Sequence, residues 1–250
     1  MPNVISVVSG KGGVGKTTFS INLAAALNEF GHNNLLIDAD VSNPNLLLML
    51  QIPHVPLTLQ DVIKDKVDIE HAIRVHHTGL RVVPTSHALE NKLDLSKLGE
   101  AIETLPETVI LDSPPGIDDP NIRSILALSD RVIVVTNPEV PAVTAAAKII
   151  KLAKDLKKTD IGVVLNRTRE DQFDLIKDEV EIMCETPIIG MIPEDPAVRR
   201  AGFDTLPVIY HSPLAPSTVQ YMRLAARLLG KEYSPPKYLS FKRLLAKIRK

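Results

Sequence analysis

Uninterrupted apolar runs recur along this chain and predict strands that are buried on both faces. The runs lie at residues 4–8, 35–38, 80–83, 108–112, 131–136, 161–165 and 188–192. They are rich in Val and Ile and do not alternate with polar residues, which is typical of parallel strands covered on both sides. Stretches with helical periodicity separate most of them, at residues 16–30, 94–104, 122–129, 140–156, 172–183 and 214–229. This alternation predicts an α/β fold with a doubly wound, mostly parallel β-sheet flanked by helices, and with its ligand site beyond the carboxyl ends of the strands.

Composition and length agree with one globular domain. The chain has 250 residues, of which 44% are hydrophobic and 24% charged. Its one cysteine, Cys184, excludes a disulfide or a paired-cysteine metal site within one chain. No apolar run approaches the roughly 20 residues of a membrane-spanning helix, and the start of the sequence lacks the pattern of a secretory signal. We therefore expect a protein of the cytoplasm.

A glycine-rich segment follows the first predicted strand and opens the first predicted helix. Its sequence, GKGGVGKT over residues 10–17, fits the phosphate-binding pattern G-x-x-x-x-G-K-[ST]. Glycines let successive backbone N–H groups face phosphate oxygens, and the start of the helix adds partial positive charge. We expect Lys16 to reach the β- and γ-phosphates and the Thr17 hydroxyl to ligate Mg²⁺. The nucleotide-binding candidates here are Gly10, Lys11, Gly12, Gly13, Val14, Gly15, Lys16, Thr17 and Thr18.

The lysine directly after the first glycine makes this loop more specific. Lys11 gives the segment KGGVGKTT, which resembles the deviant Walker A loop of the MinD/ParA family of P-loop ATPases, and its archaeal-like MinD-type members in particular. The resemblance implies that the chain hydrolyses ATP to ADP and phosphate with Mg²⁺, and that ATP joins two copies in a homodimer. In such a dimer Lys11 would reach the phosphates of the partner and stabilise charge in the transition state. The alternative is a solvent-facing loop lysine.

Carboxylates close two of the predicted strands. Asp38 and Asp40 end the second strand and, two residues apart in an extended segment, point the same way. The resemblance implies that Asp38 joins the water shell of Mg²⁺ and that Asp40 positions or activates the attacking water. Asp112 ends another strand and is interpreted as the Walker B acid for Mg²⁺, while the N–H of Gly116 would sense the γ-phosphate. The alternative for Asp40 and Asp112 is that they cap neighbouring helices.

Two later segments match the adenine site of the same family. Asn166 and Arg167 directly follow the sixth predicted strand, at the position that contacts adenine in the family. Pro193 and Glu194 begin the loop that walls the base through its backbone. Both segments fit ordinary turns as well, since Asn and Pro-x-Asp are frequent in loops.

The last 14 residues differ in charge from the rest of the chain. Residues 237–250 hold six Lys/Arg and no Asp/Glu, whereas the other 236 residues hold 23 Lys/Arg and 30 Asp/Glu, a net charge of −7. On a helical wheel most apolar residues gather in an arc of about 120° with most basic residues opposite, the pattern of an interfacial membrane anchor. The residues expected to contact an anionic membrane are Tyr238, Phe241, Lys242, Arg243, Leu244, Leu245, Lys247 and Ile248. Packing of this segment against the acidic body and binding to nucleic acid are the alternatives.

These features divide the chain into an ATPase domain at residues 1–230, a linker at 231–236 marked by two consecutive prolines, and the basic segment at 237–250. The resemblance implies an ATPase that dimerises on ATP, binds the inner face of the cell membrane and is released by hydrolysis, with a further protein as activator or effector. Its role would be spatial organisation, such as placement of the division site. The main alternative is a ParA-like ATPase that partitions DNA, which the acidic body disfavours. A metal-cluster carrier of the Mrp type is disfavoured because this chain lacks paired cysteines.

Overall fold

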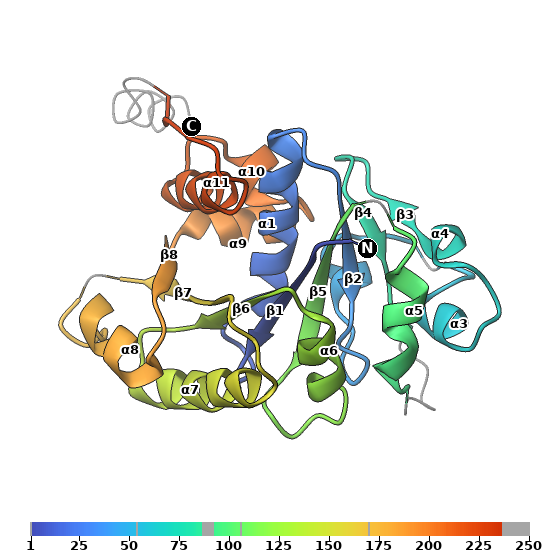
Figure 1. Ribbon diagram of the computed structural model, residues 1–250. Helices are drawn as coiled ribbons and strands as arrows, with labels where there is room; N and C mark the ends of the chain where they lie inside the picture. Colours follow the sequence, from blue (N-terminus) through green and yellow to red (C-terminus); the bar gives the residue numbers. More distant parts are fainter. Residues whose placement is uncertain (1, 54, 87–92, 106, 170, 237–250) are drawn as a thin grey trace.

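An eight-stranded sheet forms the centre of the part of the chain that the computed structural model describes, residues 2–53, 55–86, 93–105, 107–169 and 171–236 (Figure 1). The strand order is β3-β4-β2-β5-β1-β6-β7-β8, and all neighbours are parallel except the antiparallel pair β3 and β4. The strands are β1 Val4–Ser9, β2 Asn34–Asp38, β3 Arg74–Val75, β4 Arg81–Val83, β5 Thr108–Pro115, β6 Arg131–Thr136, β7 Ile161–Thr168 and β8 Ile188–Pro193.

Helices connect the strands and cover both faces of the sheet. They are α1 Lys16–Glu29, α2 Leu46–Met49, α3 Leu59–Ile63, α4 Ile69–Ala72, the 3₁₀ turn η1 Leu95–Lys97, α5 Leu98–Ile102, α6 Ile122–Leu128, α7 Val140–Asp155, α8 Lys177–Cys184, α9 Pro196–Phe203, α10 Val208–His211 and α11 Pro216–Leu228. On one face α1, α9, α10 and α11 share a core with β1 and β8. The other face carries α3 to α5 over β2 and β5, and α6 to α8 over β6 and β7 (Figure 1).

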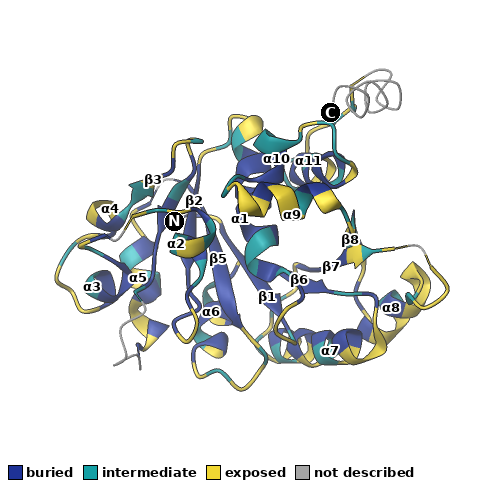
Figure 2. Cartoon of the chain, turned by 180° about the vertical axis from the view of Figure 1, so that it is seen from behind, coloured by how far each residue is buried: buried dark blue, intermediate teal, exposed yellow. Residues whose placement is uncertain are grey.

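Burial of the central strands confirms the interpretation of the apolar runs. Every residue of β1 and β2 is buried, and Figure 2 shows the buried interior continuing from the sheet into the inner faces of the helices. A strand that is buried on both faces has no reason to alternate apolar with polar residues. The predicted doubly wound, mostly parallel sheet is therefore confirmed.

All seven predicted strands are present, and the missed elements are short. β3 has two residues, of which Val75 is exposed, so it left no apolar run to find. The helices α2, α3, α4 and α10 have only four or five residues and are too short to show helical periodicity. Helix α9 did carry a start signal, because Asp195 caps it by accepting the Ala197 N–H at 2.9 Å and Pro196 stands in its first turn.

The helix predicted over residues 172–183 begins five residues later than expected, at Lys177. Asp171 is the reason, because its Oδ1 accepts the N–H groups of Phe173 at 2.9 Å and Asp174 at 3.2 Å. A short acidic side chain that binds the following backbone in this way competes with helix formation. The Leu175 N–H donates to the Pro138 carbonyl at 2.8 Å and so ties this segment to the start of α7 instead.

The expected membrane-binding segment, residues 237–250, lies outside the described residues. The linker before it packs on the C-terminal end of α1, where the Lys231 ammonium donates to the Phe30 carbonyl at 3.1 Å. The ring of Tyr233 meets the ring of Phe30 edge to face, with 6.3 Å between centroids. None of the described helices is long and apolar enough to span a bilayer.

Cys184 gives a direct test of how firmly α8 is packed. The residue is buried, and burial raises the pKa of its thiol to about 11. Because the thiolate is the reactive form, we expect a thiol reagent at pH 8 to modify the native protein at least about a hundredfold more slowly than the protein in guanidinium chloride. Since the chain has one cysteine, the absorbance of released thionitrobenzoate reports this site alone. Similar native and denatured rates would show that α8 opens readily.

Candidate functional site

The loop between β1 and α1 is shaped by two glycines that no other residue could replace. A Cβ on Gly10 would lie 2.1 Å from the backbone carbonyl carbon and oxygen of Ala145, so α7 can approach the loop only at a glycine. Gly15 has a φ of +89°, and a Cβ there would lie 2.6 Å from Nδ2 of Asn166. The absence of a side chain at these two positions lets the loop lie directly against α7 and against Asn166 at the end of β7.

The loop presents an array of backbone donors at the start of α1. Among the described residues, none accepts a hydrogen bond from the backbone N–H groups of residues 11–15. The partial positive charge of the α1 N-terminus lies at the same place. Backbone donors and a helix start that face one point form an anion site, as the phosphate-binding pattern predicted.

Lys16 forms a buried ion pair with Asp112. The Lys16 ammonium lies 3.1 Å from Asp112 Oδ1, and the hydroxyl of Ser20 donates to the same oxygen at 2.9 Å. The other carboxylate oxygen, Oδ2, is buried and has no hydrogen-bond partner among the described residues. Such an oxygen is costly to bury, and it is suited to a cation or to an ion's water shell. Lys11 is exposed, and none of the described side chains pairs with it.

Asp38 lies beside Asp112, since the two residues are register partners in β2 and β5. Its Oδ2 accepts the N–H groups of Asn45 and Leu46, both at 3.1 Å, and so Asp38 caps α2. Burial, and then repulsion by Asp112, raise the pKa of Asp38 to about 8. In this environment Asp38 is stabilised as a carboxylate only when a further cation binds close to it.

Asp40 closes a turn rather than a helix. Its Oδ1 accepts the Asn43 N–H at 3.0 Å, so the capping role expected as its alternative belongs to Asp38 instead. Burial raises the pKa of Asp40 to about 6, although the Lys16 ammonium opposes the shift. The carboxyl is therefore mostly ionised at neutral pH and can accept a hydrogen bond from water.

The backbone N–H of Gly116 is not free to bind phosphate in this structure. Its N–H, predicted to sense a γ-phosphate, donates to the Ser9 carbonyl at 2.8 Å. The cause is the length of β5, which continues through Pro115, so that the Ser9–Pro115 pairing extends the sheet to the loop. In this structure the group could contact phosphate only after that bond is broken.

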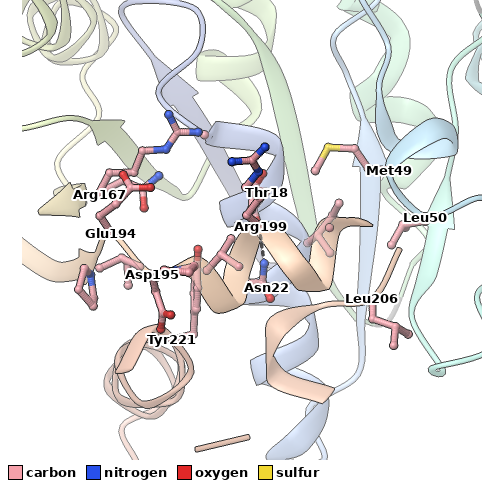
Figure 3. Close-up of a pocket in the computed structure, with 18 residues that line it drawn as sticks. Thr18, Asn22, Met49, Leu50, Arg167, Glu194, Asp195, Arg199, Leu206 and Tyr221 are labelled. Atoms are coloured by element: carbon pink, nitrogen blue, oxygen red, sulfur yellow. Dashed lines mark hydrogen bonds between the residues drawn. The ribbon is translucent and has the colours of Figure 1, made fainter. Parts of the chain in front are cut away.

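A cavity of about 510 Å³ opens beside the loop (Figure 3). Gly15 and Thr18 line it at the end of the phosphate loop, and Asn166, Arg167, Pro193 and Glu194, which were predicted to surround adenine, line it from β7 and β8. The Asn166 amide donates to the Val14 carbonyl at 2.7 Å and joins that wall to the loop. The structure thus brings the end of the phosphate loop together with the four predicted base residues. The sequence did not indicate the other lining residues, among them Ile21, Asn22, Met49, Leu50, Arg199, Leu206 and Tyr221.

The geometry is suited to a nucleotide and a divalent ion. The cavity has the volume typical of small-molecule sites, and it meets the anion site at Gly15. The described residues contain no group of three or more His, Cys, Asp or Glu that could hold a metal ion. The residues present that could hold a divalent ion are the Thr17 hydroxyl and, through water, Asp38 and Asp112, with further oxygen ligands from phosphate and water.

Comparison with known proteins agrees with this geometry. The model of the CobQ/CobB/MinD/ParA nucleotide binding domain matches residues 5–208. An ATP-binding protein of Methanocaldococcus jannaschii is 39% identical over 93% of this chain and 90% of its own length. The septum site-determining protein MinD of Pyrococcus horikoshii, solved in complex with Mg-ADP, superposes with a TM-score of 0.83 at 31% identity, covering 91% of this chain and 96% of that chain.

MinD in a MinC:MinD complex of Aquifex aeolicus is also similar, with a TM-score of 0.84 and 27% identity over 94% of this chain and 99% of that chain. Methanocaldococcus and Pyrococcus are archaea, which agrees with the expected likeness to archaeal members. The matched domain spans the phosphate loop, the strand-end carboxylates and most of the cavity wall. The chain therefore belongs to the MinD/ParA family of nucleotide-binding proteins.

Proposed function

We propose that this protein is a MinD-like ATPase that dimerises on Mg-ATP, binds an anionic membrane through residues 237–250 and is released by hydrolysis. Spatial organisation at the membrane, such as division-site placement, is the process proposed for it. The observation that carries the proposal is the joint geometry of the site. Unpartnered loop N–H groups, the buried Lys16–Asp112 pair and a nucleoside-sized cavity meet at the start of α1.

Phosphate binding gives Lys16 a second partner. Its ammonium balances Asp112 in this structure, and phosphates at the loop would draw it toward their oxygens. Asp112, and Asp38 next to it, would then be left to the water shell of Mg²⁺, with the Thr17 hydroxyl as a direct ligand. Mg²⁺ supplies positive charge against the phosphate oxygens when it is bound. Asp40, ionised near neutral pH, would orient the attacking water.

Lys11 supports the proposal of an ATP-dependent dimer. It stands on the loop next to Gly10, is exposed, and has no described partner that would hold it against its own chain. A lysine in that position can contact phosphates bound by a second copy, and the charge it adds stabilises the transition state for phosphoryl transfer. MinD in complex with MinC in Aquifex aeolicus supports a further protein as effector.

Dimerisation would convert a weak membrane contact into a strong one. Residues 237–250 can bury about five apolar side chains and bring six basic residues to an anionic surface, a gain that barely exceeds the cost of ordering the segment. Two segments on one dimer gain from effective concentration by roughly a hundredfold or more. The linker contacts with Phe30 support this coupling, because in one copy they hold the linker at the end of α1 opposite the loop.

Removing the carboxyl group of Asp40 should separate ATP binding from hydrolysis. We expect Asp40→Ala to bind Mg-ATP and to remain a dimer, because the loop and Lys16 are unchanged while the attacking water has lost its partner. Light scattering after gel filtration measures the mass. Asp118→Ala, at an exposed carboxyl, is the matched control and should hydrolyse ATP normally. Lys16→Ala should stay monomeric; a monomeric Asp40→Ala protein with bound ATP would contradict the proposal.

Truncation tests the membrane segment. A chain ending at Pro236 should keep its ATPase activity and lose ATP-dependent sedimentation with vesicles that contain anionic lipid, because both the apolar arc and the six basic charges are gone. Vesicles of neutral phosphatidylcholine serve as the control surface. Undiminished sedimentation of the truncated chain would eliminate the anchor. Salt-sensitive binding to duplex DNA by the full chain, without vesicle binding, would support a DNA-partitioning ATPase instead.

The raised pKa of Asp38 predicts a pH-dependent stability. Between about pH 4 and pH 8 the carboxyl is protonated in the native state and ionised in the unfolded state, so the free energy of unfolding should fall as pH rises through this window. Asp38→Asn should flatten the slope, and Mg-ADP should stabilise the wild type more at pH 8 than at pH 6. Urea unfolding at several pH values measures both effects. Equal slopes in the two proteins would show that Asp38 is already ionised without a cation.

A further inference from the structure

The floor of the cavity holds a hydroxyl group that the folded chain does not use. Tyr221, on α11, is 1% exposed, and none of the described residues forms a hydrogen bond with its hydroxyl. Its ring packs against Phe19 of α1, with 5.8 Å between centroids. Phenylalanine would make the same apolar contacts, and the hydroxyl faces the open space of the cavity rather than packed protein. The hydroxyl is therefore available to form a hydrogen bond with a ligand that enters the cavity.

Two observations place this hydroxyl within reach of a nucleoside. Tyr221 lines the same cavity as Asn166 and Pro193, and Figure 3 shows its hydroxyl end pointing from α11 into the space between Glu194 and Arg199. A nucleotide whose phosphates lie on the loop would enter this cavity past Gly15. The opposite end of that nucleotide is its base, so the base is the part that meets the floor.

Two other polar side chains that line the cavity, Asn22 and Asp195, already have partners within the chain. The Asn22 amide donates to the Thr18 carbonyl at 2.8 Å, and its oxygen accepts the Val208 N–H at 2.7 Å. Asp195 accepts the N–H and hydroxyl of Ser217 at 3.1 and 2.8 Å. Burial raises the pKa of Tyr221, so its hydroxyl stays protonated and can both donate and accept.

We infer that the Tyr221 hydroxyl hydrogen-bonds the purine edge of the bound nucleotide and makes the cavity floor contribute to base binding. The inference rests on the proposed function, since it requires a nucleotide on the phosphate loop. Adenine offers both an amino donor and ring-nitrogen acceptors to such a hydroxyl. Tyr221 is then a binding residue at the base, remote from the phosphates where hydrolysis occurs.

The test compares ligands with and without a base. We expect Tyr221→Phe to raise the Kd for Mg-ATP by about fivefold to thirtyfold, because one hydrogen bond is lost and its partner on the base stays buried. The Kd for inorganic tripolyphosphate, which has no base, should not change. Tyr210→Phe is the matched control, because its hydroxyl donates to the Ala25 carbonyl at 3.5 Å outside this cavity. Calorimetry measures both ligands without requiring turnover.

Each outcome bears on a different claim. An unchanged Kd for ATP in Tyr221→Phe, or an equal loss for ATP and tripolyphosphate, would overturn the role of the hydroxyl at the base. A wild-type protein that binds neither ligand would overturn the proposed function itself. Thermal melts check that the variants fold. If Tyr221→Phe does not fold, wild-type protein labelled with ¹³C at the tyrosine ζ carbon replaces it: the Tyr221 signal should shift with ATP and stay in place with tripolyphosphate, and a signal that ignores ATP would overturn the inference.

Discussion

Three buried carboxyl groups compete for one ammonium at the centre of this site. Asp38 and Asp112 are register partners on adjacent strands, Asp40 follows two residues later, and Lys16 is the cation that contacts Asp112. Burial raises the pKa of both Asp38 and Asp40, and repulsion by Asp112 adds to each shift. Burying charges is costly unless they are paired. One ammonium cannot neutralise three carboxyl groups, so a further cation would be favourable at the place where phosphate and Mg²⁺ would meet. Asp38 also accepts the first N–H groups of α2, so the start of that helix depends on the same carboxyl group.

The sheet provides the rigidity that such a cluster requires. Each acidic side chain is attached to, or directly follows, a strand that is paired on both sides and covered by helices on both faces. Gly10 allows α7 to pack against the phosphate loop, and Asn166 fastens the loop to β7. The carboxyl groups therefore cannot relax by moving apart, and a cation bound between them would favour the ionised form of Asp38.

The sequence was informative where a pattern is long or where chemistry demands particular residues. Apolar runs of four or more residues revealed every strand except β3, and the loop motif identified Lys16 and Thr17, because glycine spacing and lysine position follow from how a backbone holds phosphate. Tyr221 and Leu206 could not be predicted as neighbours of Asn166. They lie far apart in the chain, have no motif, and meet only because α9 and α11 pack beside α1. The engaged N–H of Gly116 likewise depends on strand pairing that composition does not reveal.

Helix α1 links two parts of the protein that are distant in sequence. Its first turn carries the phosphate loop, and its last turn holds the linker through Phe30, Lys231 and Tyr233. An α-helix resists stretching along its axis, since every turn is closed by hydrogen bonds parallel to that axis. A pull on the chain beyond Pro236 would therefore act on the last turn of α1 as well as on α11, which the linker continues. Through α1, mechanical load on this end of the chain has a route to the phosphate-binding loop.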